Sequence, residues 1–308
     1  GTEYVTLKII SELNKHLKTF NGFMVSEKKL ISNKHNIFSK DDSIEKAIII
    51  CPVSQISYLK QLNYKNCRVI FWSHHPHDCI SNVKNASEMI SLGEYQHCSN
   101  KKNNYINFLI QNPFPKPIKM KYLTRIKKKL PENFVFIGAL GPAKGLHLVL
   151  DYWPKIRRTF TNSKLNIIGG DLYRQKQNNL TKNFFFENNY EKFIERKLNK
   201  MSCEDRESIK FLGLLSSKKK DMILRNSDVA LLNPSGKSEA APASPLECYC
   251  YGIPVVSGGD FGAYDNMKHF PELDLKKENI NNIIKTLSIT HKYLELRKRA
   301  YKFSKNNF

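Results

Sequence analysis

The stretch "DVALLNPSGKSEAAPASPLECYCYGIPVVS", residues 228–257, decides the fold of this chain. Its segments at residues 228–235 and 253–258 have the composition of buried strands, and residues 244–252, "SPLECYCYG", have that of a helix. A strand, a helix and a second strand in this order are typical of a parallel sheet with helices on its faces. The stretch therefore predicts an α/β domain that binds its ligand in the loop between the first strand and the helix.

Two carboxylates of this stretch, Glu239 and Glu247, are candidate ligand-binding groups. Ser244, Pro245 and Glu247 form an S-x-x-E capping box with Gly252 as the stop signal, so one interpretation is that Glu247 caps its own helix. The other is that its carboxylate, beside a helix N-terminus, binds ribose hydroxyls. Glu239 has no such local role, because it lies in the small-residue loop "SEAAPAS", where the backbone can approach a ligand closely.

The same alternation of strands and helices extends over the second half of the chain. We expect strands at residues 133–140, 164–171 and 209–215, and helices at residues 145–160 and 217–227. Behind the first strand, Gly138, Gly141 and Gly145 surround Lys144 in a turn that matches neither a Walker A loop nor a dinucleotide fingerprint. Such a turn either holds a diphosphate through backbone donors and one positive charge or is an ordinary tight turn.

The first half of the chain alternates in a similar way. Strands are expected at residues 22–27, 46–52, 67–72, 87–92 and 106–111, and helices at residues 5–20 and 54–63. A basic segment flanked by prolines, at residues 113–131, breaks the pattern and is interpreted as the interdomain connection. We therefore expect two doubly wound domains, at residues 1–118 and 119–308, with the last helix packing back on the first domain.

The composition limits the class of protein. The 50 Lys and Arg against 28 Asp and Glu residues give a formal net charge of +22, which indicates an anionic partner such as nucleic acid, acidic lipid or a phosphorylated substrate. No segment has the length of a membrane-spanning helix or the pattern of a secretory signal peptide. The seven scattered cysteines are interpreted as reduced thiols, and we expect a cytoplasmic protein.

Taken together, the motifs of the second half resemble the C-terminal domain of the retaining glycosyltransferases of family 4. That family opens the domain with G-R-x4-K-G and later has an E-x7-E motif, a helix and a G-x-P-V-V strand. Here these are "IGALGPAKG", "EAAPASPLE" and "YGIPVVS", within residues 131–260. The resemblance implies the GT-B fold, which consists of two Rossmann-like doubly wound domains facing across a cleft, and transfer of a sugar from a nucleotide-diphosphate sugar with retention of configuration.

The resemblance also implies roles for individual residues. Lys144, in the turn with Gly141, would contact the donor diphosphate. Glu247 would accept hydrogen bonds from the donor ribose. Where the family has an arginine after the first glycine, this chain has Ala139, so another basic side chain would replace that ligand.

On the same basis, Glu239 is a candidate catalytic residue that would hold hydroxyls of the transferred sugar, with the backbone of Ala241 and Pro242 lining the edge of that subsite. In the first half, "GTE" at residues 1–3 resembles the family's glycine-rich loop, which makes Gly1 a further candidate for donor binding. We then expect that the first strand of this domain is missing from the chain.

The segment "VIFWSHH", residues 69–75, falls where the family has a strand that ends in a histidine at the interdomain cleft. His74, and after it His75, are therefore candidate catalytic residues that would contact the transferred sugar or the acceptor. A rival interpretation is a metal-dependent hydrolase, with His74, His75, His77 and Asp78 as ligands. The other histidines are isolated in the sequence, which disfavours that rival.

A basic nucleic-acid-binding protein is a second rival, disfavoured because the lysines are dispersed and no recognised binding motif is present. The resemblance implies no metal and no cofactor, since basic side chains and helix dipoles neutralise the diphosphate in that family. The expected partners are a nucleotide sugar, a saccharide or lipid-linked acceptor of polysaccharide or glycoconjugate biosynthesis, and the anionic inner face of a membrane.

Overall fold

The structure, a computed structural model, describes residues 23–25, 36–38, 44–45, 48–53, 56–61, 63–73, 75, 88–100, 106–111, 115–118, 130–170, 190–237 and 239–307. The helix expected at residues 5–20 lies outside these ranges. So do four residues of the candidate sites, namely Gly1, His74, His77 and Asp78.

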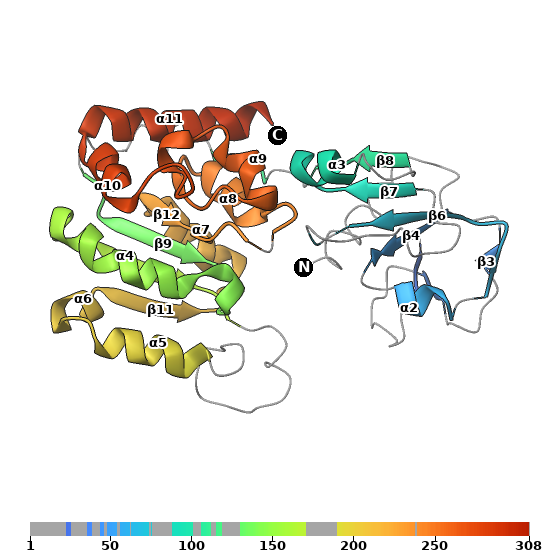
Figure 1. The fold of residues 1–308 in the computed structure, drawn as a ribbon, viewed down its shortest axis with the longest axis horizontal. Helices are drawn as coiled ribbons and strands as arrows, with labels where there is room; N and C mark the ends of the chain where they lie inside the picture. The colour runs from blue at the N-terminus through green and yellow to red at the C-terminus, as the bar shows by residue number, and fades with distance from the viewer. Residues whose placement is uncertain are drawn as a thin grey trace. The chain divides into compact units, whose positions relative to one another are not determined.

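The chain divides into two compact units (Figure 1). One consists of Gly1–Trp72, Cys79–Ile90 and Asn104–Ile106, and the other of Ser73–Asp78, Ser91–Asn103 and Asn107–Phe308. The domain limits expected at residues 118 and 119, and the packing of the last helix on the first domain, stay predictions.

The amino-terminal strands form one four-stranded sheet and two short parallel pairs. The sheet has the order β4 (Ile48–Pro52), β6 (Arg68–Trp72), β7 (Glu88–Ser91) and β8 (Ile106–Leu109), and the pairs are β1 (Phe23–Val25) with β2 (Asn36–Phe38) and β3 (Ile44–Glu45) with β5 (Tyr64–Lys65). β4, β6 and β7 run parallel, as the alternation of strands and helices predicted. The five strands expected in this half of the chain are confirmed as β1, β4, β6, β7 and β8, whereas β2, β3 and β5 were not predicted.

Two described helices lie in the first half of the chain, between these strands in sequence. α2 (Ile56–Leu59) is shorter than the helix expected at residues 54–63, because the chain turns after Leu59 to form β5. α3 (Glu94–Asn100) follows β7 and was not predicted. Buried Cys51, Phe71 and Met89 pack with Leu59 into a small apolar core.

The carboxyl-terminal sheet has five parallel strands in the order β11-β10-β9-β12-β13. Their bounds are β9 (Asn133–Ile137), β10 (Lys164–Ile168), β11 (Ile209–Gly213), β12 (Val229–Leu231) and β13 (Val255–Val256). The chain builds outward from β9 to β11, then returns to the other side of β9 for β12 and β13. β9 and β12 are therefore neighbours whose connections leave in opposite directions, which makes their carboxyl ends the switch point where doubly wound sheets bind ligands.

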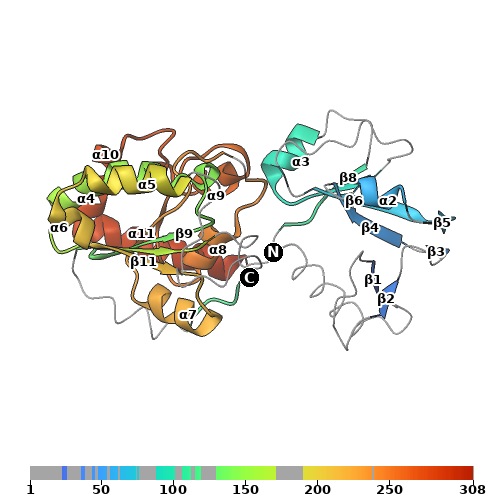
Figure 2. The same cartoon turned by 90° about the horizontal axis from the view of Figure 1, so that it is seen from below.

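Helices cover both faces of this sheet. Figure 2 shows α4 and α5 on one side of the strands and α7 on the other. The helical segments are η3 (Pro142–Lys144), α4 (Leu146–Thr159), α5 (Tyr190–Asn199), α6 (Cys203–Glu207), α7 (Ser217–Arg225), α8 (Ala243–Tyr249), η5 (Phe261–Ala263), α9 (Tyr264–Met267), η6 (Pro271–Leu273), α10 (Ile280–Ser288) and α11 (Thr290–Asn306). The helices expected at residues 145–160 and 217–227 are confirmed as α4 and α7.

α4 shows why these helices pack where they do. Its buried residues, at helical spacing on one face, are Leu146, Val149, Leu150, Trp153 and Ile156. The Trp153 ring contacts that of Phe134 on β9 edge to face, at 5.5 Å between centroids, and its Nε1–H donates to Ser208 Oγ at 2.8 Å. An indole buried in this way contributes apolar area and still satisfies its one polar group.

The capping box predicted at the start of α8 is wrong. The helix begins at Ala243, with Pro242 as its N-cap and no side-chain cap hydrogen bond, so Ser244 lies inside the first turn. Pro245 is tolerated there because N–H groups of the first turn have no partner within the helix. The expected stop at Gly252 is confirmed, since this residue has φ of +63° and its N–H donates to Tyr249 O.

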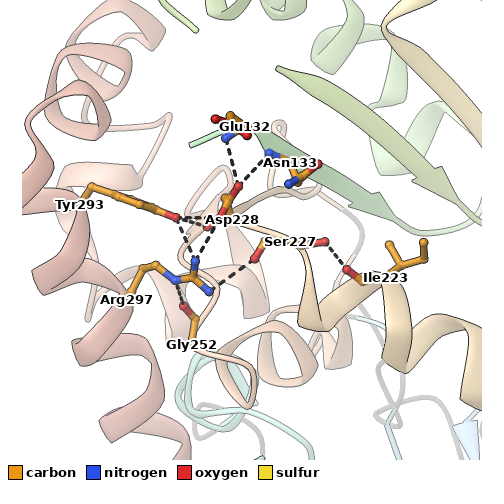
Figure 3. A network of polar contacts seen from close by, with 8 residues as sticks. All are labelled: Glu132, Asn133, Ile223, Ser227, Asp228, Gly252, Tyr293 and Arg297. Atoms are coloured by element: carbon orange, nitrogen blue, oxygen red, sulfur yellow. Dashed lines mark hydrogen bonds and ion pairs between the residues drawn. The ribbon is translucent and has the colours of Figure 1, made fainter. Parts of the chain in front are cut away.

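Arg297, a buried arginine of α11, forms hydrogen bonds to residues just before β12 and just after α8 (Figure 3). Arg297 donates from Nε to Gly252 O at 2.9 Å, and from Nη1 to Asp228 Oδ1 and to Tyr293 OH, both at 3.1 Å. Only 7% of the Arg297 side chain and 12% of the Asp228 side chain are exposed. Burial raises the pKa of Tyr293 well above its ordinary value, so its hydroxyl keeps its proton.

Asp228 extends this network to the sheet. Its Oδ2 accepts hydrogen bonds from the backbone N–H groups of Glu132 at 3.0 Å and Asn133 at 2.9 Å, next to the start of β9. Its own N–H donates to Asn133 O at 2.7 Å, which aligns the starts of β9 and β12 (Figure 3). The network therefore fixes the amino ends of the two strands whose carboxyl ends form the switch point.

The cysteines that the structure describes, Cys51, Cys67, Cys98, Cys203, Cys248 and Cys250, are free thiols, as expected. Burial raises the pKa of the Cys250 thiol to about 12 and that of Cys51 to about 11, so both are inert at neutral pH. Across the described part of the chain, none of the helices is both long and apolar enough to cross a membrane.

Candidate functional site

A small pocket opens at the switch point of the carboxyl-terminal sheet. It is lined by residues at or after the carboxyl ends of β9, β12 and β13 and by the start of α8, namely Ile137, Gly138, Lys144, Leu232, Asn233, Glu239, Pro242, Ser244, Pro245, Ser257 and Ala263. Three of the residues predicted for the donor site, Lys144, Glu239 and Pro242, thus line one pocket.

The glycine-rich turn after β9 places Lys144 at this pocket. Gly141 begins the turn in an extended conformation, and its carbonyl oxygen accepts a hydrogen bond from the Lys144 N–H at 3.1 Å. Gly145 then adopts φ of +69°, which favours glycine, and a Cβ there would approach Pro234 Cδ at 3.1 Å. The turn can therefore pass close to the loop after β12 and lead directly into α4.

Lys144 and Glu239 meet in this pocket as an ion pair between Nζ and Oε1. Their side chains are 28% and 20% exposed, so each charge is partly withdrawn from water but can reach a ligand. An ammonium group can bind a phosphate oxygen, and a carboxylate can accept hydrogen bonds from sugar hydroxyls. The pair therefore places a group that can bind phosphate next to a group that can bind sugar hydroxyls, as a glycosyl phosphate would require.

The loop of Glu239 is supported by a segment that the sequence did not single out. Gly262, in η5, donates its N–H to Glu239 O at 2.9 Å. A Cβ on Gly262 would fall 1.8 Å from Ala240 O, so only glycine allows the two backbones to lie this close. Ala241 and Pro242 follow, half-buried and buried, and continue this loop toward α8.

Asn233, two residues after the end of β12, is a second residue that sequence reasoning missed. It is buried with φ of +36°, and its side chain donates to Lys237 O at 2.9 Å and accepts from Ser235 Oγ at 2.9 Å. Its carbonyl oxygen accepts from the N–H groups of Gly236 and Gly258. The Asn-Pro-Ser-Gly sequence is a turn signal that could have identified this residue.

Glu247 is placed by a contact with α7. Its Oε1 lies 2.6 Å from Lys220 Nζ, and the two side chains are 23% and 31% exposed. This ion pair, rather than a capping box, accounts for the orientation of the carboxylate in the structure.

Of the predicted histidines, only His75 is described. It is exposed, and its backbone oxygen accepts hydrogen bonds from Ser73 Oγ at 3.3 Å and Gln96 Nε2 at 2.8 Å. The roles of His74 and His75 stay predictions. Within the ranges that the structure describes, no three His, Cys, Asp or Glu side chains are grouped as metal ligands.

The model of the family described as glycosyl transferases group 1 matches residues 124–306, more than half of the chain. No curated protein matches the chain in a sequence comparison.

Solved structures with a similar fold are glycosyltransferases of the GT-B type. TarM has a TM-score of 0.62 and 15% identity over 85% of this chain and 52% of its own. The pneumococcal O-GlcNAc transferase GtfA, in complex with UDP and GlcNAc, has a TM-score of 0.54 and 10% identity over 85% of this chain and 54% of its own. Sucrose-phosphate synthase from Thermosynechococcus elongatus has a TM-score of 0.56 and 13% identity over 85% of this chain and 69% of its own. The chain thus spans about half the length of TarM and GtfA. The expected α/β fold of the GT-B type, with Rossmann-like parallel sheets, is confirmed.

Proposed function

The chain belongs to the glycosyl transferases group 1 family, and on this premise we propose that it is a retaining glycosyltransferase of family 4. It would move a sugar from a nucleotide-diphosphate sugar to a glycan or lipid-linked acceptor. The observation that carries the proposal is the Lys144–Glu239 ion pair in a pocket at the switch point of the sheet. The presence of UDP with GtfA supports a nucleotide as the carrier of the sugar.

The proposed donor contacts combine this geometry with the roles that the family resemblance implies. Lys144 binds the diphosphate, next to the first turn of α4, whose dipole adds positive potential. Glu239 binds hydroxyls of the transferred sugar, and Glu247 binds the ribose. Ala139 provides no positive charge, so Lys144 carries more of the interaction with phosphate than in family members that have an arginine there.

The proposed reaction is a substitution at the anomeric carbon. The acceptor hydroxyl oxygen forms a bond to C1, the bond from C1 to the phosphate oxygen breaks, and its electron pair stays on the departing diphosphate. The proton of the acceptor hydroxyl passes to that phosphate oxygen, so the proposal requires no protein base. Lys144 stabilises the negative charge that grows on the leaving group, and it is held in place before the reaction begins.

A thermal-shift screen with UDP-, GDP-, ADP- and dTDP-sugars in the presence of EDTA tests the proposal. We expect one of these donors to raise the melting temperature, because a ligand that binds only the folded state stabilises it. We expect the same shift with and without EDTA, since Lys144 rather than a divalent cation neutralises the diphosphate. No shift with any donor would contradict the proposed activity, and a shift that EDTA abolishes would contradict metal independence.

The excess of basic residues motivates the last part of the proposal. We propose that the protein works in the cytoplasm at an anionic membrane surface that presents its acceptor, because a net charge of +22 favours such a surface. We expect the protein to sediment with liposomes that contain anionic lipid at physiological salt, but not with neutral liposomes. If equal amounts of the protein stayed in the supernatant with anionic and with neutral liposomes, the proposed membrane association would be wrong.

A further inference from the structure

The ion pair between Lys220 and Glu247 raises the question of what Lys220 contributes. Because Glu247 does not cap α8, its carboxylate is oriented by a residue on a different helix. We infer that Lys220 is a positioning residue for donor binding, which holds Glu247 in the orientation that accepts hydrogen bonds from the ribose. This inference rests on the proposed function.

α7 presents Lys220 from a fixed position. The neighbouring Asp221 accepts a hydrogen bond from Tyr251 OH at 2.7 Å through Oδ1, and from Arg225 Nε at 2.7 Å through Oδ2. The hydrogen bond from Arg225 keeps the pKa of Asp221 below its ordinary value, so this anchor is charged at neutral pH. Tyr251 follows α8 closely in the chain, so the Asp221–Tyr251 contact holds α7 against the helix that carries Glu247.

The geometry leaves Glu247 able to bind a ligand. A carboxylate has two oxygens that together accept about four hydrogen bonds, and the ion pair with Lys220 is made through Oε1. The remaining capacity suits the vicinal hydroxyls of a ribose.

Lys220 also compensates the negative charge of Glu247. Both side chains are withdrawn from water over more than two thirds of their surface, where charges interact more strongly than in bulk solvent. A nucleoside diphosphate brings further negative charge, so an uncompensated carboxylate beside it would weaken binding. With Lys220 paired to it, Glu247 contributes its acceptor oxygens without this repulsion.

The test compares Lys220→Gln with the wild type in calorimetric titrations with UDP, ADP and GDP, each paired with its 2′-deoxy form. For the nucleotide that binds, we expect the wild type to prefer the ribose form by about tenfold, the effect of one hydrogen bond to a charged group. Lys220→Gln should bind the ribose form about tenfold more weakly and lose most of this preference. Lys220→Arg, which keeps the charge, should restore it.

Lys219→Gln is the matched control, because Lys219 is the preceding residue on the same helix and its side chain is exposed. It should keep the wild-type affinity and preference. If Lys220 only stabilised α7, Lys220→Gln would weaken both forms of the nucleotide equally, and an unchanged preference would overturn the inference. If the wild type binds none of these nucleotides, the proposed function fails and this inference fails with it.

Discussion

Replacing Glu239 with alanine should reduce the release of nucleoside diphosphate from the donor by about two orders of magnitude, the usual effect of losing one preorganised polar contact in an active site. In the proposed donor complex the Glu239 carboxylate accepts hydrogen bonds from sugar hydroxyls, and in the structure it forms an ion pair with the ammonium of Lys144 in the pocket. Because the Glu239 side chain lies outside the hydrophobic core and its partner Lys144 keeps 28% of its side chain in contact with water, the melting temperature should change little. Chromatographic measurement of the released nucleotide checks the activity.

The control is Glu195→Ala, which removes an exposed carboxylate of α5 and should leave the rate unchanged. Lys144→Ala should cause a loss similar to that of Glu239→Ala. The double variant should be scarcely worse than either single one, because the two groups act as a unit. A Glu239→Ala enzyme with wild-type activity would refute the donor assignment.

Replacing Arg297 with methionine is expected to lower the free energy of unfolding of the larger unit by about 3–5 kcal/mol. The substitution leaves Asp228 buried without its cation and removes the donor to Gly252 O and Tyr293 OH. A buried charge that loses its partner costs far more than a surface ion pair contributes. Urea denaturation followed by tryptophan fluorescence in a Trp72→Phe background, where Trp153 in the core of this unit reports alone, measures the effect.

Lys298→Met gives the matched comparison for Arg297→Met, since Lys298 is the next residue of α11 and is exposed. It should change the free energy of unfolding by less than about 0.5 kcal/mol. If the two variants had equal stability, the network of Figure 3 would contribute nothing to folding.

The strands of the carboxyl-terminal sheet could be predicted because each is a short run of apolar residues followed by a turn signal. Phe134, Val135 and Phe136 of β9 are all fully buried, as a strand covered on both faces requires. The start of α8 was predicted wrongly. The pattern of Ser244 and Glu247 is local, whereas the partner of Glu247 is Lys220, on a different helix.

The candidate site could be predicted in part. The sequence indicated Lys144 and Glu239 separately, but no local pattern shows that two residues so far apart form one ion pair. Gly262 left no periodic signal, because its role is a close approach of two backbones that only the folded chain displays. The short strands β2, β3 and β5 have two or three residues each, too few for a pattern of alternation to be recognised.

The ion pair of Lys144 and Glu239 also has a consequence for selectivity. Lys144 and Glu239 neutralise each other's charge in the pocket, so a ligand must compete with that internal contact. Inorganic phosphate can bind the lysine but brings a second negative charge toward Glu239, and a neutral sugar offers hydroxyls to the carboxylate but nothing to the lysine. Only a molecule that carries an anion and a polyol at adjacent positions satisfies both groups at once. At the proposed donor site, tight binding would therefore require both chemical features, which would disfavour small anions and free sugars.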